Sequence, residues 1–157
     1  MIFVSGIHGV GKNYLCNKLK ETTGIRHYSA SEIISTQKEK SFSANKLVEN
    51  IDENQECLLP VVEYLKTKCN LFLLDGHFCL TNDSGVIQRV PLKVFESLAP
   101  EAIILLTAEP EVIAERRKKR DGISLDLNNL KDFQNMEIEY AKEVAQRLNI
   151  PLILSKC

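Results

Sequence analysis

A glycine-rich segment separates an apolar run from a helix-period run near the start of this chain. Residues 6–12 read Gly-Ile-His-Gly-Val-Gly-Lys and fit the spacing G-x-x-x-x-G-K. The apolar run before them predicts a buried strand, and the pattern after them predicts a helix. In this context the loop's N–H groups and the helix N-terminus surround phosphates, and the lysine neutralises them. We therefore expect a nucleoside triphosphate site formed by Gly6, Ile7, His8, Gly9, Val10, Gly11, Lys12, Asn13 and Tyr14.

Two further residues are candidates for holding the magnesium ion that accompanies a triphosphate. Asn13 stands where the motif has a Ser or Thr hydroxyl, and an amide oxygen is also a suitable ligand for a hard cation. Asp75 ends the apolar run 71–75 and supplies the second acidic group that such sites use. His77 follows at the mouth of the expected site, where we expect it to contact an acceptor or act as a base; a histidine that only packs remains an equal alternative.

The rest of the chain alternates short apolar runs with helix-period segments. This alternation predicts an α/β fold with a parallel sheet and crossover helices. Together with the phosphate-binding loop and the five strands below, we expect a three-layer α/β/α fold with a five-stranded parallel sheet of the P-loop NTP hydrolase type. The expected strands are Ile2–Ser5, Arg26–Ser29, Leu71–Asp75, Ala102–Thr107 and Leu152–Leu154. The expected helices are Lys12–Thr22, Ala30–Gln37, Ala44–Ile51, Cys57–Lys68, Pro110–Lys119 and Leu127–Leu148. Turn residues 82–85, flanked by apolar runs, predict a small hairpin.

Length and composition narrow the class of protein. A chain of 157 residues has room for one hydrophobic core, so we expect a single domain over 1–157. No run approaches the length of a membrane helix, and no secretory signal pattern precedes the first strand. Five cysteines, an odd number without a C-x-x-C pair, favour reduced thiols in the cytoplasm. A net charge of −1 argues against a nucleic-acid partner.

Cations gather at the end of the helix predicted at 110–119. Arg116 and Arg120 are four residues apart and therefore share one helix face. Guanidinium groups on one face can stabilise the charge that develops during phosphoryl transfer. The alternative is that these cations complement the helix dipole and stay solvated. Beside a phosphate-binding loop we favour the catalytic interpretation, with Lys12, Asp75, Arg116 and Arg120 as the catalytic set.

Three segments together resemble a known family. They are Gly6 to Lys12, Leu73 to Gly76, and Ile103 to Glu111 leading into Arg116. With them the chain resembles the adenylate kinase and nucleoside monophosphate kinase group, especially its compact archaeal-type members. The resemblance implies ATP and Mg²⁺ as the donor, a helical acceptor-binding region at about residues 29–60, and a short arginine-bearing lid near 116–126.

The chain departs from that group at the acceptor. The group carries one arginine shortly after the second strand and one just after the D-G pair, but residues 28–35 and 75–79 contain none. Ser31, Glu32 and His77 would suit a hydroxyl-bearing or differently charged acceptor. We therefore expect an ATP-dependent kinase that acts on a nucleotide or another small molecule, as a monomer or dimer.

Two other interpretations stay open. A P-loop ATPase or nucleotide-dependent regulatory module would explain Asn13 and the absent acceptor arginines. An RNA-associated factor would rest only on the basic run 116–120. GTP is disfavoured as the nucleotide because residues 45–48 and 67–70 do not supply the N-K-x-D guanine contact.

Overall fold

The computed structural model describes residues 1–42, 51–81 and 85–157. Five strands form one parallel sheet in the order β2-β3-β1-β6-β7, and two short strands form a separate antiparallel pair, β4-β5. The strands are β1 (Ile2–Ser5), β2 (Arg26–Ser29), β3 (Phe72–Asp75), β4 (Cys79–Thr81), β5 (Ile87–Arg89), β6 (Ala102–Thr107) and β7 (Leu152–Lys156). The helices are α1 (Lys12–Thr23), α2 (Ala30–Phe42), α3 (Ile51–Lys68), α4 (Leu92–Leu98), α5 (Pro110–Asp121) and α6 (Leu127–Leu148).

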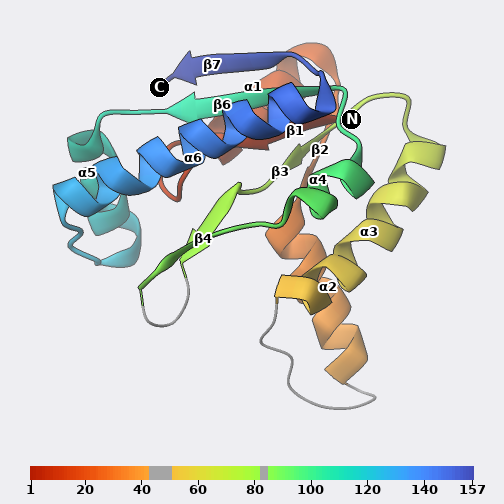
Figure 1. Ribbon diagram of the computed structural model, residues 1–157, viewed down its shortest axis with the longest axis horizontal. Helices are drawn as coiled ribbons and strands as arrows, with labels where there is room; N and C mark the ends of the chain where they lie inside the picture. The colour runs from red at the N-terminus through yellow and green to blue at the C-terminus, as the bar shows by residue number, and fades with distance from the viewer. Residues whose placement is uncertain (43–50, 82–84) are drawn as a thin grey trace.

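The central strands β3, β1 and β6 are covered on both faces, which gives the three layers. One cluster of apolar side chains joins β1, β3 and β6 to α3, α4 and α6, and includes Phe3, Leu74 and Ile103. A second cluster joins the same strands to α1 and α5, and includes Val4 and Leu73. Because neighbouring residues of a strand point to opposite faces, these alternating positions place helices on both sides. Figure 1 shows α6 and α4 on one side of the sheet. The predicted three-layer α/β fold is confirmed.

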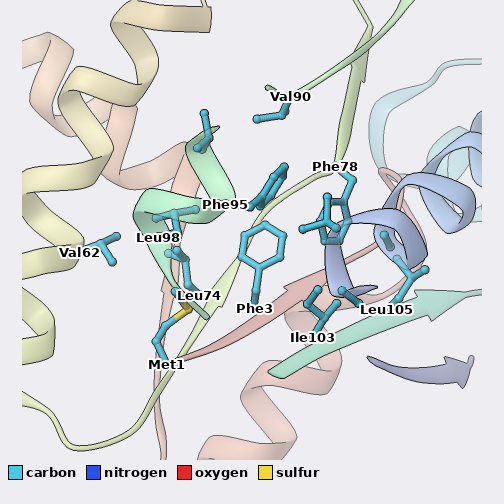
Figure 2. Close-up of a cluster of buried hydrophobic side chains, with 14 of the residues drawn as sticks. Met1, Phe3, Val62, Leu74, Phe78, Val90, Phe95, Leu98, Ile103 and Leu105 are labelled. Carbon is cyan, nitrogen blue, oxygen red and sulfur yellow. The ribbon is translucent and has the colours of Figure 1, made fainter. Parts of the chain in front are cut away.

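Aromatic rings form the centre of the larger cluster. Phe3 on β1 packs against two phenylalanines that also contact each other, with its ring centroid 5.3 Å from that of Phe78 and 5.6 Å from that of Phe95 (Figure 2). Both neighbouring contacts are edge-to-face, the arrangement that the ring quadrupoles favour. The packing fixes the segment after β3 against the first strand, so it also fixes the geometry of the site described below.

The long helix α6 begins and ends as its sequence dictates. Asp126 caps the N-terminus by accepting a hydrogen bond from the Asn129 backbone N–H at 2.9 Å. Asn149, with a φ of 53°, ends the helix in the left-handed conformation. The apolar stripe of α6 contains the buried Leu130, Tyr140 and Val144. This stripe packs on the sheet and directs Glu137 into the interior.

Most predicted elements agree with the structure. All five predicted strands form the parallel sheet, and the predicted hairpin is the β4-β5 pair. The helix α4 was not predicted, and α3 begins at Ile51 rather than at Cys57. The helix predicted at Ala44–Ile51 lies, apart from Ile51, outside the described residues. Within the described ranges, no helix combines the length and apolar character needed to cross a membrane.

Candidate functional site

The glycine-rich loop connects β1 to α1 in a conformation that only glycine adopts without strain. Gly6 has a φ of 140°, and a Cβ atom at this position would lie 2.6 Å from the carbonyl oxygen of Leu106. Gly11, with a φ of 116°, is the N-cap residue of α1. The glycines of the motif therefore let the loop pass close to β6 and turn into the helix. The side chains of Ile7 and Val10 are buried in the apolar core, so these two residues face the site only through their backbone.

Lys12 lies buried inside the curve of this loop. Its Nζ donates a hydrogen bond to the carbonyl oxygen of Gly6 at 2.6 Å and lies 3.4 Å from His77 Nε2. Burial lowers the pKa of Lys12 to about 8, although the nearby carboxylates of Asp75 and Glu137 act in the opposite direction. Within the described part of the chain, Lys12 Nζ contacts no carboxylate directly, so this buried ammonium group is poised to gain from an anionic ligand.

A cavity of about 660 Å³ opens around Lys12 at the carboxyl ends of the parallel strands. On one side of the loop it is lined by residues that follow β2 and β3, namely Ser29, Ser31, Glu32, Asp75 and His77. On the other side it is lined by Arg116 and Arg120 of α5 and by Cys157 after β7. Between them lie His8, Gly9, Gly11, Lys12, Asn13 and Tyr14 of the loop and α1. Ligands of open α/β sheets bind at this edge.

Asp75 is held in place by residues of the neighbouring strand. Its Oδ2 accepts a hydrogen bond from His27 Nε2 at 2.5 Å, and its Oδ1 accepts one from Ser29 Oγ at 3.4 Å. Ser29 is opposite Asp75 in the β2-β3 register. The Ser29 hydroxyl also lies 3.0 Å from Ser31 Oγ. Parallel pairing thus brings together side chains more than forty residues apart in the chain. His27 was not predicted as a site residue, because nothing in its local sequence indicates its partner.

The chain has three histidines, and all of them lie at this site. The rings of His8 and His77 are in contact, with centroids 4.2 Å apart. Burial lowers the pKa of His77 to about 2, with further lowering from Lys12 and His8. Burial also lowers the pKa of His8 to about 4. Both rings are therefore neutral near pH 7. His77 Nδ1 is buried and has no hydrogen-bond partner among the residues that the structure describes.

The arginines of α5 reach the loop from the opposite side. Arg116 Nη1 donates a hydrogen bond to the carbonyl oxygen of Val10 at 2.8 Å. Arg120 donates two hydrogen bonds to Asp121, at 2.7 and 2.9 Å. Arg117 also binds Asp121, at 2.5 Å, and covers Gly9 so closely that a Cβ there would lie 2.9 Å from its Cγ. The hydrogen bond from Arg120 is the main reason that the pKa of Asp121 falls to about 2.

Glu137 is a buried carboxylate that the sequence did not single out. Its side chain accepts hydrogen bonds from Ser5 Oγ at 2.5 Å and from the backbone N–H groups of Phe78 and Cys79 at 3.0 and 2.7 Å. Burial raises its pKa, while these hydrogen bonds act to lower it. Glu137 therefore connects the start of the phosphate-binding loop to the segment after His77. Its only sequence signal is a charged residue within an otherwise apolar stripe.

Comparison with known proteins places this geometry in a family. The AAA domain family matches residues 5–134, which include the loop, Asp75 and the α5 arginines. The chain belongs to this family. The chain is also similar to the adenylate kinase of Sulfurisphaera tokodaii, with 31% identity over 133 residues that cover 74% of this chain and 67% of the relative. The adenylate kinase of Pyrobaculum aerophilum is 23% identical over 139 residues, covering 85% of this chain and 71% of the relative. The predicted resemblance to the adenylate kinase-like group is confirmed.

Two solved kinase structures have the same fold as this chain. A sugar kinase from Janibacter sp. HTCC2649 has a TM-score of 0.58 at 17% identity, over 99% of this chain and 83% of that one. A gluconokinase from Sinorhizobium meliloti 1021 has a TM-score of 0.51 at 17% identity, over 99% of this chain and 81% of that one. At this identity the likeness concerns the arrangement of strands and helices.

The donor atoms at the site fit the magnesium ion that P-loop proteins of this kind use. Asn13 and Asp75 both line the cavity and offer an amide and a carboxylate oxygen. Mg²⁺ prefers oxygen ligands and binds through one or two protein groups together with phosphates and water. Among the described residues, no group of three or more His, Cys, Asp or Glu side chains could hold a metal ion alone. This donor set suits an ion that arrives with a nucleotide.

Proposed function

We propose that this AAA-family chain is an ATP-dependent kinase that transfers the γ-phosphate of ATP to a small-molecule acceptor. The observation that carries the proposal is the position of Lys12, which is buried in a cavity with a carboxylate on one side and guanidinium groups on the other. Phosphoryl transfer needs this combination, because the reaction is catalysed mainly by positioning and by charge stabilisation. The membership of the adenylate kinase-like group supports the same activity.

In this proposal the loop and α1 hold the triphosphate. Backbone N–H groups of residues 6–13 and the N-terminus of α1 surround the phosphates. On binding, Lys12 Nζ exchanges the Gly6 carbonyl oxygen for oxygens of the β- and γ-phosphates. Asn13 and Asp75 would hold Mg²⁺, which supplies additional neutralisation of the phosphate charge. His8, Gly9 and Tyr14 complete the donor side of the cavity.

The arginines of α5 stabilise the transferring group. Arg116 is fixed against the loop by its hydrogen bond to Val10, so it needs little reorganisation. Arg120 is held by Asp121 and can exchange that carboxylate for a phosphate oxygen. In the proposed mechanism, the segment 116–126, from the end of α5 to the start of α6, serves as the lid.

His77 acts as a neutral hydrogen-bonding group rather than as a base. A general base works best with a pKa near the operating pH, and a pKa of about 2 lies far below it. The neutral ring still offers one donor and one acceptor nitrogen for hydrogen bonding. Replacing His77 by Asn should therefore lower turnover with an acceptor, leave ATP affinity nearly unchanged, and introduce no new inflection in the pH profile.

The assay that tests the function measures ADP release with Mg²⁺ and ATP, without acceptor and with a panel of acceptors. We expect release that depends on one class of acceptor and disappears in Lys12→Ala. Lys18→Ala is a matched control, since Lys18 lies on the same helix but is exposed and does not line the cavity. Release that ignores every acceptor would contradict the kinase proposal.

That contradictory outcome would instead support an ATPase or a nucleotide-dependent regulatory module. Two observations favour this second candidate. Asn13 replaces the hydroxyl residue of the motif, and Asp75 is engaged by His27 before any ligand arrives. Under this alternative, ATP hydrolysis would proceed at the same rate with and without acceptor.

We further propose that the protein works in the cytoplasm, as a monomer or dimer, on small molecules rather than nucleic acid. Its five cysteines are all unpaired, which agrees with a reducing compartment. Two of them, Cys16 and Cys79, are buried, and burial raises the pKa of each to about 12, so their thiols are inert near neutral pH.

A further inference from the structure

The cavity has opposite charge on its two sides. On the β6-β7 side of the loop stand the guanidinium groups of Arg116 and Arg120. On the β2-β3 side stand the carboxylates of Glu32 and Asp75, together with the hydroxyls of Ser29 and Ser31. Lys12 lies between the two sides, with its Nζ turned to the Gly6 carbonyl oxygen. The donor phosphates belong with the loop and the arginines, so the β2-β3 side is left for the acceptor.

No arginine serves the β2-β3 side. All six arginines of the chain lie in its described part, and Arg26 stands at the opposite end of β2, where it pairs in register with Phe72. Arg89 pairs with Glu143, and Arg147 lies in the last turn of α6. The remaining three belong to α5. Asp75 is engaged by His27 and is proposed to hold Mg²⁺, so Glu32 is the carboxylate left to face the acceptor. The described lining of this side contains no Lys or Arg side chain apart from Lys12 at its boundary with the loop.

A phosphorylated acceptor is poorly matched to such a surface. A phosphate monoester carries about two negative charges near neutral pH. Inside a cavity the repulsion between like charges is stronger than in bulk water, because the effective dielectric constant is lower. A hydroxyl compound instead finds groups of matching chemistry, since carboxylates accept hydrogen bonds and serine hydroxyls both donate and accept them.

We propose that the β2-β3 side binds an acceptor that carries hydroxyl groups and no anionic group, so that the enzyme is a polyol kinase rather than a nucleoside monophosphate kinase. This inference rests on the proposed kinase function. In the reaction, an acceptor hydroxyl oxygen forms a bond to the γ-phosphorus, and the bond from that phosphorus to the bridging oxygen breaks. Its electron pair leaves with ADP, and the hydroxyl proton passes to water.

Glu32 is the residue that makes the proposal specific. It lies in the first turn of α2, is exposed, and lines the cavity. A carboxylate there favours a neutral or cationic acceptor over an anionic one by electrostatic repulsion. Reversing its charge should therefore reverse the preference, while the donor side, on the far side of the loop, is left intact.

The experiment compares matched acceptor pairs that differ only by a phosphate group. ADP release is measured with adenosine and AMP, ribose and its monophosphate, glucose and its monophosphate, and glycerol and its monophosphate. For the wild type we expect kcat/KM to be at least about tenfold higher for the unphosphorylated member of the preferred pair. Glu32→Gln should narrow this ratio, and Glu32→Arg should reverse it. Glu96→Arg, an exposed charge reversal on α4, should leave it unchanged.

The outcomes separate this inference from the function on which it rests. Preference for the phosphorylated members, or a ratio that Glu32→Arg does not move, would overturn the polyol proposal and leave the kinase intact. ADP release that no member of any pair stimulates would overturn both. Binding of ATP to Glu32→Arg with wild-type affinity shows that the variant is folded and that its donor site is unaffected.

Discussion

Glu137 and Ser5 join two segments of the candidate site through a hydrogen bond of 2.5 Å, in which the Ser5 hydroxyl donates to Glu137 Oε1. The same carboxylate receives the backbone N–H groups of Phe78 and Cys79. Ser5 immediately precedes the phosphate-binding loop, and Phe78 immediately follows His77. One buried side chain of α6 thus sets the position of both segments that surround Lys12.

This relationship predicts that Glu137→Gln destabilises the fold. All three partners donate hydrogen bonds to the carboxylate. In either orientation of the glutamine amide, its NH₂ group would therefore face at least one backbone N–H donor. We expect the free energy of unfolding to fall by about 1–3 kcal/mol, measured by urea denaturation. Ser5→Ala, which removes one of the three bonds, should cost less. Glu139→Gln, exposed on the same helix, should change stability by no more than about 0.5 kcal/mol. A fully stable Glu137→Gln protein would refute this role.

Gly6 is expected to tolerate no side chain. Gly6→Ala would combine an unfavourable positive φ with a Cβ 2.6 Å from the Leu106 carbonyl oxygen. The loop must then move, so we expect loss of measurable ATP binding in titration calorimetry. Gly24→Ala is the matched control, because Gly24 also has a positive φ, of 74°, but has no atom within 4 Å of the added Cβ. It should cost about 1–2 kcal/mol of stability and keep ATP affinity. Equal ATP affinity in both variants would show that the loop can relax.

The pKa of Lys12 predicts a pH dependence of ATP binding. Phosphates bind the protonated ammonium group, whereas burial lowers the pKa of Lys12 in the free protein to about 8. The bound phosphates raise the pKa of Lys12, so above about pH 8 ATP binding requires Lys12 to take up a proton. The affinity for ATP should then fall by up to about tenfold per pH unit. Below that pH the affinity should be flat with respect to this group. Lys12→Arg keeps its charge over the whole range and should remove the alkaline fall. Wild-type affinity that stays constant up to pH 10 would contradict the assignment.

Arg120 is predicted to act more on the transition state than on ATP binding. It is exposed and engaged with Asp121 in the free protein, and in the proposed mechanism it exchanges this carboxylate for a phosphate oxygen as charge develops. Arg120→Ala should lower kcat by about tenfold to a thousandfold and change ATP affinity much less. Lys119→Ala, which removes the adjacent cation that pairs with Glu115, should leave both values near wild type. Equal losses in kcat and in binding would indicate a ground-state contact instead.

The sequence predicted those parts of the fold and site that local patterns determine. Each of these features has a local sequence signal. The glycine spacing marks the loop, the end of an apolar strand marks Asp75, and a shared helix face marks Arg116 and Arg120. The structure places every predicted side chain of the site at the cavity, apart from Ile7 and Val10, and the backbone of Gly6 forms the start of the loop. The catalytic and binding roles assigned to these residues remain predictions.

The residues that were missed depend on pairing between distant segments. His27 is recognisable only once β2 and β3 are in register, because only then does its ring reach Asp75. Glu137 can be assigned to the site only once α6 is known to cross the sheet at the level of Ser5. Arg117 can be assigned only once α5 is known to lie against Gly9. The helix α4 was missed because its seven residues, Leu92–Leu98, are too few to establish a helical period.

A single-turnover experiment tests most directly whether the γ-phosphate of ATP is transferred to an organic acceptor. It uses γ-labelled ATP, Mg²⁺ and the best acceptor of the panel. We predict that the label leaves ATP and appears in a phosphate ester of the acceptor, and that Lys12→Ala abolishes the transfer. Label that appears only as inorganic phosphate, at a rate that the acceptor does not change, would contradict this prediction.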